Sequence, residues 1–190
     1  MATQTLTSLA DYFSLLHQSG TKLEYNAGEI VAMAGAQPAH NIIISNVTYR
    51  LMDCLMQKGC VLFNSDQLIK IEDCDKYTFP DLVIVCGKPV YEKNAYGLNA
   101  LLNPEIIVEV LSESTASYDR TEKFDCYRTL PSFREYILIS SDKKRVDVHK
   151  KLNESEWLTH IYTGKEEYVA IDDCAILLEN LYYAVDFPTP

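Results

Sequence analysis

The chain has 190 residues, 47% of them hydrophobic and 23% charged, and its 17 basic and 27 acidic residues give a net charge of −10. These proportions suit one globular domain over residues 1–190, and no apolar run of about 20 residues and no signal-peptide pattern is present. We therefore expect a cytoplasmic protein without a membrane partner, and the acidic balance argues against the broad basic surface that nucleic-acid binders usually present.

The first third of the chain predicts helix, hairpin, helix. Ser8 can cap a helix whose apolar residues recur at helical spacing over 9–16. Two short strands then flank Asn26-Ala27-Gly28, a sequence typical of a hairpin turn. The longest helical pattern follows Pro38 and stops at Gly59. Its apolar residues fall four apart, at Ile43, Val47, Leu51 and Leu55.

The middle of the chain predicts strands. Short apolar or alternating runs cover 60–63, 68–71 and 82–86. A loop of about twenty residues is expected over 87–105, and loops of this length are often functional. The run 106–111 is apolar almost throughout, which is typical of a central strand in a sheet.

The last third predicts one helix and an antiparallel group of strands. The helix runs over about 116–129 and ends before Pro131, and strands follow at 134–139, 145–150 and 157–162. The order of elements favours a mixed α/β or α+β sheet with helices on its faces. The densest basic stretch lies on these strands and forms either a local patch for nucleic acid or a solvated hairpin; its members are Lys143, Lys144, Arg145, Lys150 and Lys151.

The six cysteines show no metal-binding spacing. None of them forms a Cys-x-x-Cys pair, which argues against a structural zinc site. Several lie inside apolar runs, so we expect reduced thiols in the core rather than disulfides.

Two acids stand where apolar residues are expected. Glu109 interrupts the central strand, and a buried carboxylate must pair or bind metal. Asp81 precedes the strand at 82–86, so the two acids could meet if their strands are neighbours. On the following helix, Asp119, Lys123 and Tyr127 are spaced four apart and share one face.

These residues admit two interpretations. Two carboxylates with Mg²⁺ and a lysine form a site for phosphodiester hydrolysis, in which the metal activates water and the lysine stabilises developing charge. Alternatively, Glu109 and Lys123 form a buried salt bridge, and Asp81 is a residue at the start of a strand. Spacing alone leaves both open.

A family resemblance bears on this choice. Pro80-Asp81, an acid on a strand and a later lysine resemble the PD-(D/E)xK nuclease superfamily. More closely, the run 103–112, with Asp119-Arg120, Glu122-Lys123-Phe124 and Tyr127, resembles the bacterial Uma family of restriction-type endonucleases. The likeness extends over roughly 12–150.

The resemblance implies a restriction-endonuclease-like fold, with a mixed central sheet flanked by helices. It also implies a site for Mg²⁺ or Mn²⁺ held by Asp81 and Glu109, with Glu24 either completing the metal site or lying as an exposed hairpin carboxylate. The superfamily places its lysine two residues after the second acid, where this chain has Leu111; the Uma pattern carries it on the next helix, as Lys123. The chain departs from the family at Glu113 and Thr121, which are not metal ligands.

His40 also fits the family pattern, and it either contacts phosphate or caps the long helix. The resemblance implies an endonuclease acting on DNA, and a homodimer is expected from double-strand cleavage. Two other functions remain open: a catalytically silent module of the same fold that binds nucleic acid or protein, which the net charge favours, and a metal-dependent hydrolase of another phosphate ester.

Overall fold

The computed structural model describes residues 6–33, 35–112 and 115–187. Glu113, one of the two positions at which the chain departs from the family, lies outside these residues. Among the described residues, no helix is both long and apolar enough to cross a membrane.

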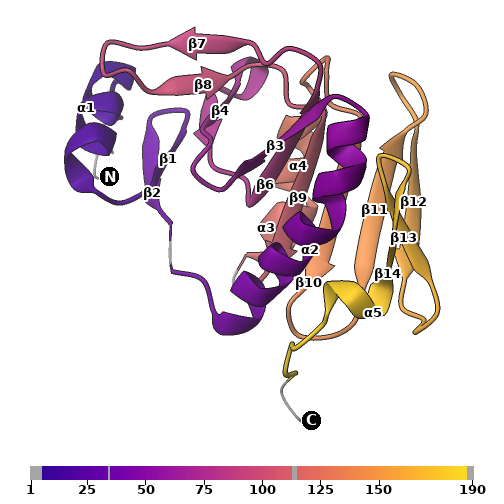
Figure 1. Ribbon diagram of the computed structural model, residues 1–190. Helices are drawn as coiled ribbons and strands as arrows, with labels where there is room; N and C mark the ends of the chain where they lie inside the picture. The colour runs from indigo at the N-terminus through magenta and orange to yellow at the C-terminus, as the bar shows by residue number, and fades with distance from the viewer. Residues whose placement is uncertain (1–5, 34, 113–114, 188–190) are drawn as a thin grey trace.

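One six-stranded sheet, the β9 sheet, forms the centre of the molecule (Figure 1). Its strand order is β12-β11-β10-β9-β6-β3, and all neighbours are antiparallel except β9 and β10, which run parallel. Its strands are β3 (Cys60–Asn64), β6 (Leu82–Cys86), β9 (Ile106–Leu111), β10 (Glu135–Ser140), β11 (Val146–Lys151) and β12 (Trp157–Tyr162).

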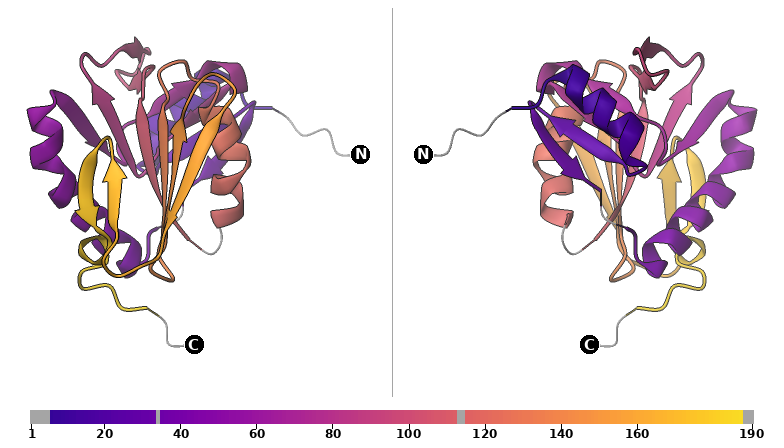
Figure 2. Two further views of the ribbon diagram at one scale, coloured as in Figure 1. Left: turned by 90° about the vertical axis from the view of Figure 1, so that its right-hand side faces the viewer. Right: turned by 90° about the vertical axis from the view of Figure 1, so that its left-hand side faces the viewer.

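Different elements cover the two faces of the β9 sheet (Figure 2). On one face lie α2 (Pro38–Gln57), the hairpin of β13 (Tyr168–Ile171) and β14 (Cys174–Leu177), and the short α5 (Leu178–Leu181). On the other face lie α3 (Ala116–Arg120) and α4 (Glu122–Tyr127). Alternation along β9 sends Ile106, Val108 and Val110 to the α2 face, and therefore turns Glu109 toward α4.

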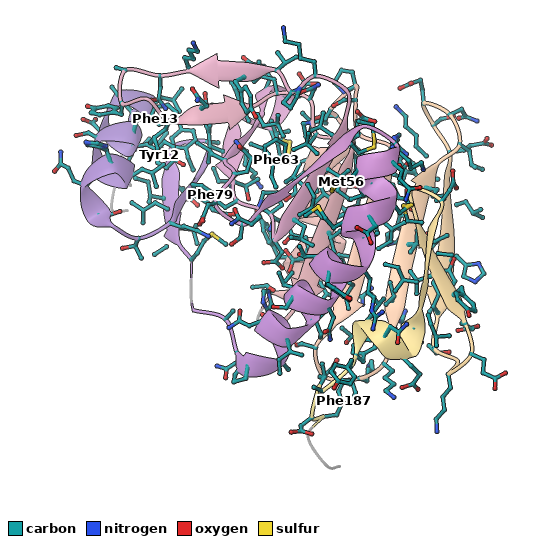
Figure 3. The ribbon with its side chains drawn as sticks, in the orientation of Figure 1. Tyr12, Phe13, Met56, Phe63, Phe79 and Phe187 are labelled. Carbon is teal, nitrogen blue, oxygen red and sulfur yellow. A yellow bond between two sulfur atoms is a disulfide. The ribbon has the colours of Figure 1, made fainter. Side chains whose placement is uncertain are left out.

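A second six-stranded sheet, the β1 sheet, lies beside the first. Its order is β2-β1-β5-β4-β8-β7. Its strands are β1 (Leu23–Asn26), β2 (Glu29–Ala32), β4 (Ile69–Ile71), β5 (Lys76–Thr78), β7 (Tyr91–Lys93) and β8 (Asn99–Leu101), and the 3-10 turn η1 (Glu72–Cys74) joins β4 to β5. The helix α1 (Leu9–Ser19) packs Tyr12 and Phe13 into an aromatic cluster with Phe79 (Figure 3).

The predicted fold class is confirmed, with three corrections to its elements. The segment 87–105 is not a plain loop, because it contains β7 and β8 at the edge of the β1 sheet. The single helix expected over 116–129 is divided at Thr121, which separates α3 from α4. The short strands β5 and β13 were not predicted, because three or four residues give too few repeats for a periodic pattern.

The prediction of reduced thiols is wrong. All six cysteines form disulfides, namely Cys54–Cys174, Cys60–Cys86 and Cys74–Cys126. Each joins elements far apart in the chain but adjacent in space, and such pairing cannot be deduced from spacing in the sequence. The third links η1 to α4, the helix that carries Lys123.

Candidate active site

Asp81 and Glu109 lie opposite each other on neighbouring strands. The antiparallel register of β6 and β9 pairs Leu82 with Val108, so the preceding Asp81 falls beside Glu109. The Asp81 N–H donates to Glu109 Oε2 at 3.3 Å, and the Val110 N–H donates to Asp81 Oδ2 at 2.8 Å. Glu109 is therefore fixed to the backbone of Asp81, and Asp81 to the backbone of Val110, the residue that follows Glu109.

Lys123 reaches this pair from α4. Its Nζ lies 2.8 Å from Glu109 Oε1 and 3.4 Å from Asp119 Oδ1, and only 7% of the lysine and 6% of the glutamate side chain are exposed. The hydroxyl of Tyr127 donates to the same Glu109 oxygen at 2.9 Å. The helix break at Thr121 thus leaves the predicted common face of Asp119, Lys123 and Tyr127 intact.

Burial and charge shift the titration of this cluster. The pKa of Glu109 is raised to about 8, mainly because burial disfavours the charged form; the Lys123 ammonium group opposes this rise, and the carboxylates of Asp81 and Asp119 add to it. Burial alone lowers the pKa of Lys123, but the acids around it, Glu109 first, raise that pKa well above its usual value. The lysine therefore stays an ammonium group, the cation around which the acids gather.

The imidazole of His40 contacts the carboxylate of Asp81. Its Nε2 lies 3.0 Å from Asp81 Oδ2, and the side chains of the pair are 17% and 13% exposed. The N-cap of α2 is Gln37, so His40 is not the helix cap. Burial lowers the pKa of His40, but the hydrogen bond and charge of Asp81 raise it overall. The imidazole therefore holds one oxygen of Asp81 in place.

Glu24 belongs to the same region but is held by another strand. Its Oε1 accepts hydrogen bonds from the Thr78 hydroxyl and, at 3.0 Å, from the Phe79 N–H at the end of β5. Its charge reaches Lys123, whose pKa it raises. Asp81, Glu109 and Glu24 are nevertheless not all within 4.8 Å of one another. They are gathered in one region without being drawn together to ligand distance.

The donor chemistry of these acids fits a hard divalent cation. Carboxylate oxygens are the protein ligands that Mg²⁺ and Mn²⁺ take. Among the hydrogen bonds and ion pairs of the described residues, none involves Asp81 Oδ1 or Glu24 Oε2, so both oxygens are open to a ligand. Asp81 and Glu24 thus each have an oxygen open to such an ion, whereas both oxygens of Glu109 already accept hydrogen bonds.

The described residues contain one tighter group of possible ligands, at the far end of β6. Cys60, Cys86 and Asp172 lie within 4.8 Å of one another. The two sulfurs are joined in a disulfide, and Asp172 is paired with Lys58 at 2.9 Å and Arg134 at 2.6 Å. A disulfide supplies no thiolate, so this group does not ligate a metal in its oxidised form.

Sequence reasoning missed two contacts of the site. It placed Asp119 on the correct helix face but did not predict its contact with Lys123. For His40 it predicted contact with phosphate or capping of a helix, whereas the imidazole contacts Asp81. The i,i+4 spacing of Asp119 and Lys123 was a usable signal. The contact of His40 with Asp81 spans 41 residues and had none.

The family model of Uma2, described as "Putative restriction endonuclease", matches residues 9–178. The chain belongs to the Uma2 family. This matched range includes Glu24, Asp81, Glu109 and Lys123, so every predicted metal ligand and the predicted lysine lie inside the Uma2 region.

Similar proteins are consistent with this membership. Two uncharacterized proteins of Synechocystis sp. are 33% (sll1609) and 30% (slr1290) identical to the chain; the matches cover 83% and 93% of this chain and 88% and 87% of the relatives. A crystal structure from Anabaena variabilis, described as a putative nuclease belonging to DUF820, superposes with a TM-score of 0.71 at 18% identity, over 91% of this chain and 96% of that one. At this identity the likeness supports the fold.

Proposed function

We propose that this Uma2 protein is a divalent-metal-dependent endonuclease that hydrolyses phosphodiester bonds in DNA. One observation carries the proposal: a carboxylate buried in an apolar central strand lies beside a second acid and contacts a buried lysine. Buried carboxylates are costly and cluster where chemistry requires them. The family membership supports the same reaction class.

Each residue receives a role from its contacts. Bound Mg²⁺ or Mn²⁺, held by Asp81, Glu109 and Glu24, would polarise the phosphate and lower the pKa of a bound water. The Lys123 ammonium stabilises the negative charge that develops on the phosphate. Tyr127 fixes Glu109 through its hydroxyl, and His40 fixes Asp81.

A cleavage assay tests this proposal. Purified protein is incubated with plasmid, linear and single-stranded DNA in Mg²⁺ or Mn²⁺, and separately in EDTA. We expect metal-dependent cleavage by the wild type and a loss of at least about 100-fold in Asp81→Asn, because one ligand charge is removed. Asp53→Asn, an exposed acid on α2, is the matched control and should cut normally.

The same assay separates the competing functions. Equal cleavage by wild type and Asp81→Asn would refute the assigned site. Binding of DNA without any metal-dependent cleavage would favour the silent nucleic-acid module, which the net charge of −10 supports. Hydrolysis of a small phosphodiester without cleavage of DNA would favour the other hydrolase.

The assembly and location of the protein are further parts of the proposal. A homodimer would place two sites on the two DNA strands, and sedimentation of the purified protein tests it. A cytoplasmic location requires that Cys54–Cys174, Cys60–Cys86 and Cys74–Cys126 persist against cellular thiols, which usually keep cytosolic cysteines reduced.

A further inference from the structure

A cavity of about 490 Å³ opens beyond the carboxyl ends of β9 and β10. Leu111 and Ser140 line it at the ends of these two strands. Arg120 lines it from α3, and Lys143 and Arg145 line it from the β10–β11 hairpin. We call it the hairpin cavity. Three of the described residues that line it are cations, and one, Asp142, is an acid.

A buried acid holds two of these cations in place. Asp147 on β11 is only 2% exposed, and it pairs with Arg120 Nη1 and, at 2.7 Å, with Arg145 Nε. Both arginine side chains remain 34% exposed. Guanidinium groups have five N–H donors each, so those not used on Asp147 are left for a second anion.

The third cation, Lys143, lies near Asp142, and its charge contributes to lowering the pKa of that acid. Lys143 is exposed and forms no ion pair or hydrogen bond among the described residues, whereas its neighbours on the hairpin and β11 are engaged elsewhere. Lys144 pairs with Glu179 at 2.6 Å, and Lys151 pairs with Glu154 at 2.8 Å. In the basic stretch, Lys144, Arg145, Lys150 and Lys151 therefore form ion pairs, and Lys143 forms none among the described residues.

The three cations and the two acids, Asp142 and Asp147, give the cavity region a local charge of +1, whereas the whole chain has a net charge of −10. The hydroxyl of Ser140 donates to Asp142 and lowers the pKa of that acid, so it is ionised at neutral pH. The cavity thus attracts anions although the chain as a whole repels them.

The hairpin cavity is close to the candidate active site. Leu111 follows Glu109 by two residues on the same face of β9, a separation of about 7 Å at the usual strand rise. Arg120 follows Asp119, which contacts Lys123. A DNA strand advances about 3.4 Å per phosphate along its axis, so the cavity lies within two or three phosphates of the cleaved one.

We propose that the hairpin cavity binds a backbone phosphate of the nucleic-acid substrate, within two or three phosphates of the bond that is cleaved. The inference rests on the proposed nuclease function. Arg120 and Arg145, fixed by Asp147, supply directed N–H donors, and Lys143 supplies a further positive charge. Phosphate contacts of this kind fix the register of DNA without reading its sequence.

Binding of a fluorescein-labelled 20-base-pair duplex, measured by anisotropy in Ca²⁺ with the DNA recovered intact, tests the inference. Lys143→Glu should weaken binding about tenfold and lower the salt slope by about 0.9 or more, since one phosphate contact is lost. Lys165→Glu is the matched control, because it makes the same charge change at an exposed lysine outside the cavity lining. It should weaken binding less than about twofold.

A variant that is expected to bind DNA more tightly controls for loss of binding through misfolding. Asp142→Asn keeps an acceptor for the Ser140 hydroxyl and removes the only acid among the described lining residues, so it should strengthen binding about threefold or more. Equal losses in Lys143→Glu and Lys165→Glu, or no gain in Asp142→Asn, would overturn the inference.

The two proposals fail separately. If the protein cleaves DNA but Lys143→Glu binds DNA no more weakly than Lys165→Glu, the proposed phosphate site is refuted and the nuclease proposal stands. Binding that follows the predicted order without any cleavage in Mg²⁺ or Mn²⁺ supports the cavity and refutes the nuclease.

Discussion

Lys123→Met removes the ammonium group that contacts both Glu109 and Asp119. Methionine keeps the unbranched length of the lysine stem, so packing against the sheet changes little. The variant leaves Glu109, 6% exposed, without its ion-pair partner 2.8 Å away. Asp119 loses its contact at 3.4 Å as well. The perturbation is therefore a buried acid that loses its ion-pair partner, rather than a cavity.

The expected loss follows from this geometry. Two unit charges 2.8 Å apart attract by about 6 kcal/mol at an effective dielectric constant of 20. The cost of burying them offsets part of this, and removing one partner of a buried pair typically costs about 3–5 kcal/mol. We expect a loss of about 3 kcal/mol for Lys123→Met, or a fall of about 1.5 M in the urea midpoint.

Urea unfolding of four proteins measures this: wild type, Lys123→Met, Glu109→Gln and the double variant. The double variant should recover most of the stability that Lys123→Met loses, since a neutral pair leaves no unpaired charge. It should still not cut DNA. A midpoint for Lys123→Met equal to that of the wild type would refute the buried ion pair. A double variant with fully additive losses would show that packing, not charge, is responsible.

Two further predictions concern other parts of the fold. Burial alone would raise the pKa of Asp147, but the guanidinium groups of Arg145 and Arg120 hold that pKa below its usual value. Its contribution is present above the unfolded pKa and is lost as pH falls through the folded pKa, so Asp147→Asn should unfold about 2 kcal/mol more easily at pH 7, and the difference from wild type should shrink as pH falls below about 4. A difference that stays the same from pH 7 down to the acid unfolding transition would contradict this. Replacing Cys74 and Cys126 by Ala opens a link across 52 residues, so thermal unfolding should show a loss of about 4 kcal/mol, and alkylation of those cysteines in the unreduced wild type would contradict the disulfide.

The long elements and their faces could be predicted from the sequence because their signals are local. Ile43, Val47, Leu51 and Leu55 repeat at helical spacing, and all four are fully buried on α2. The apolar run 106–111 is likewise the buried central strand β9. The apolar pattern matches the burial in both elements, because α2 buries one face against the sheet and the central strand β9 is buried along its whole length.

The short elements and cross-links could not be predicted. The strand β5 contains Lys76, which is buried and whose ammonium group donates to the Tyr118 hydroxyl on α3, 2.6 Å away. The disulfide Cys54–Cys174 joins residues 120 apart. In both cases the stabilising partner is supplied by another part of the chain, so the local pattern does not contain it.

The sequence by itself determined that Glu109 lies on an apolar strand and that Asp119, Lys123 and Tyr127 share one helix face. These facts follow from the repeat of a strand and of a helix. Only the tertiary structure decided that Asp81 lies beside Glu109, that His40 holds Asp81, and that Glu24 stays with β5. The reason is physical: strand register and the packing of one element on another are set by contacts between distant residues, and a local repeat carries no information about them.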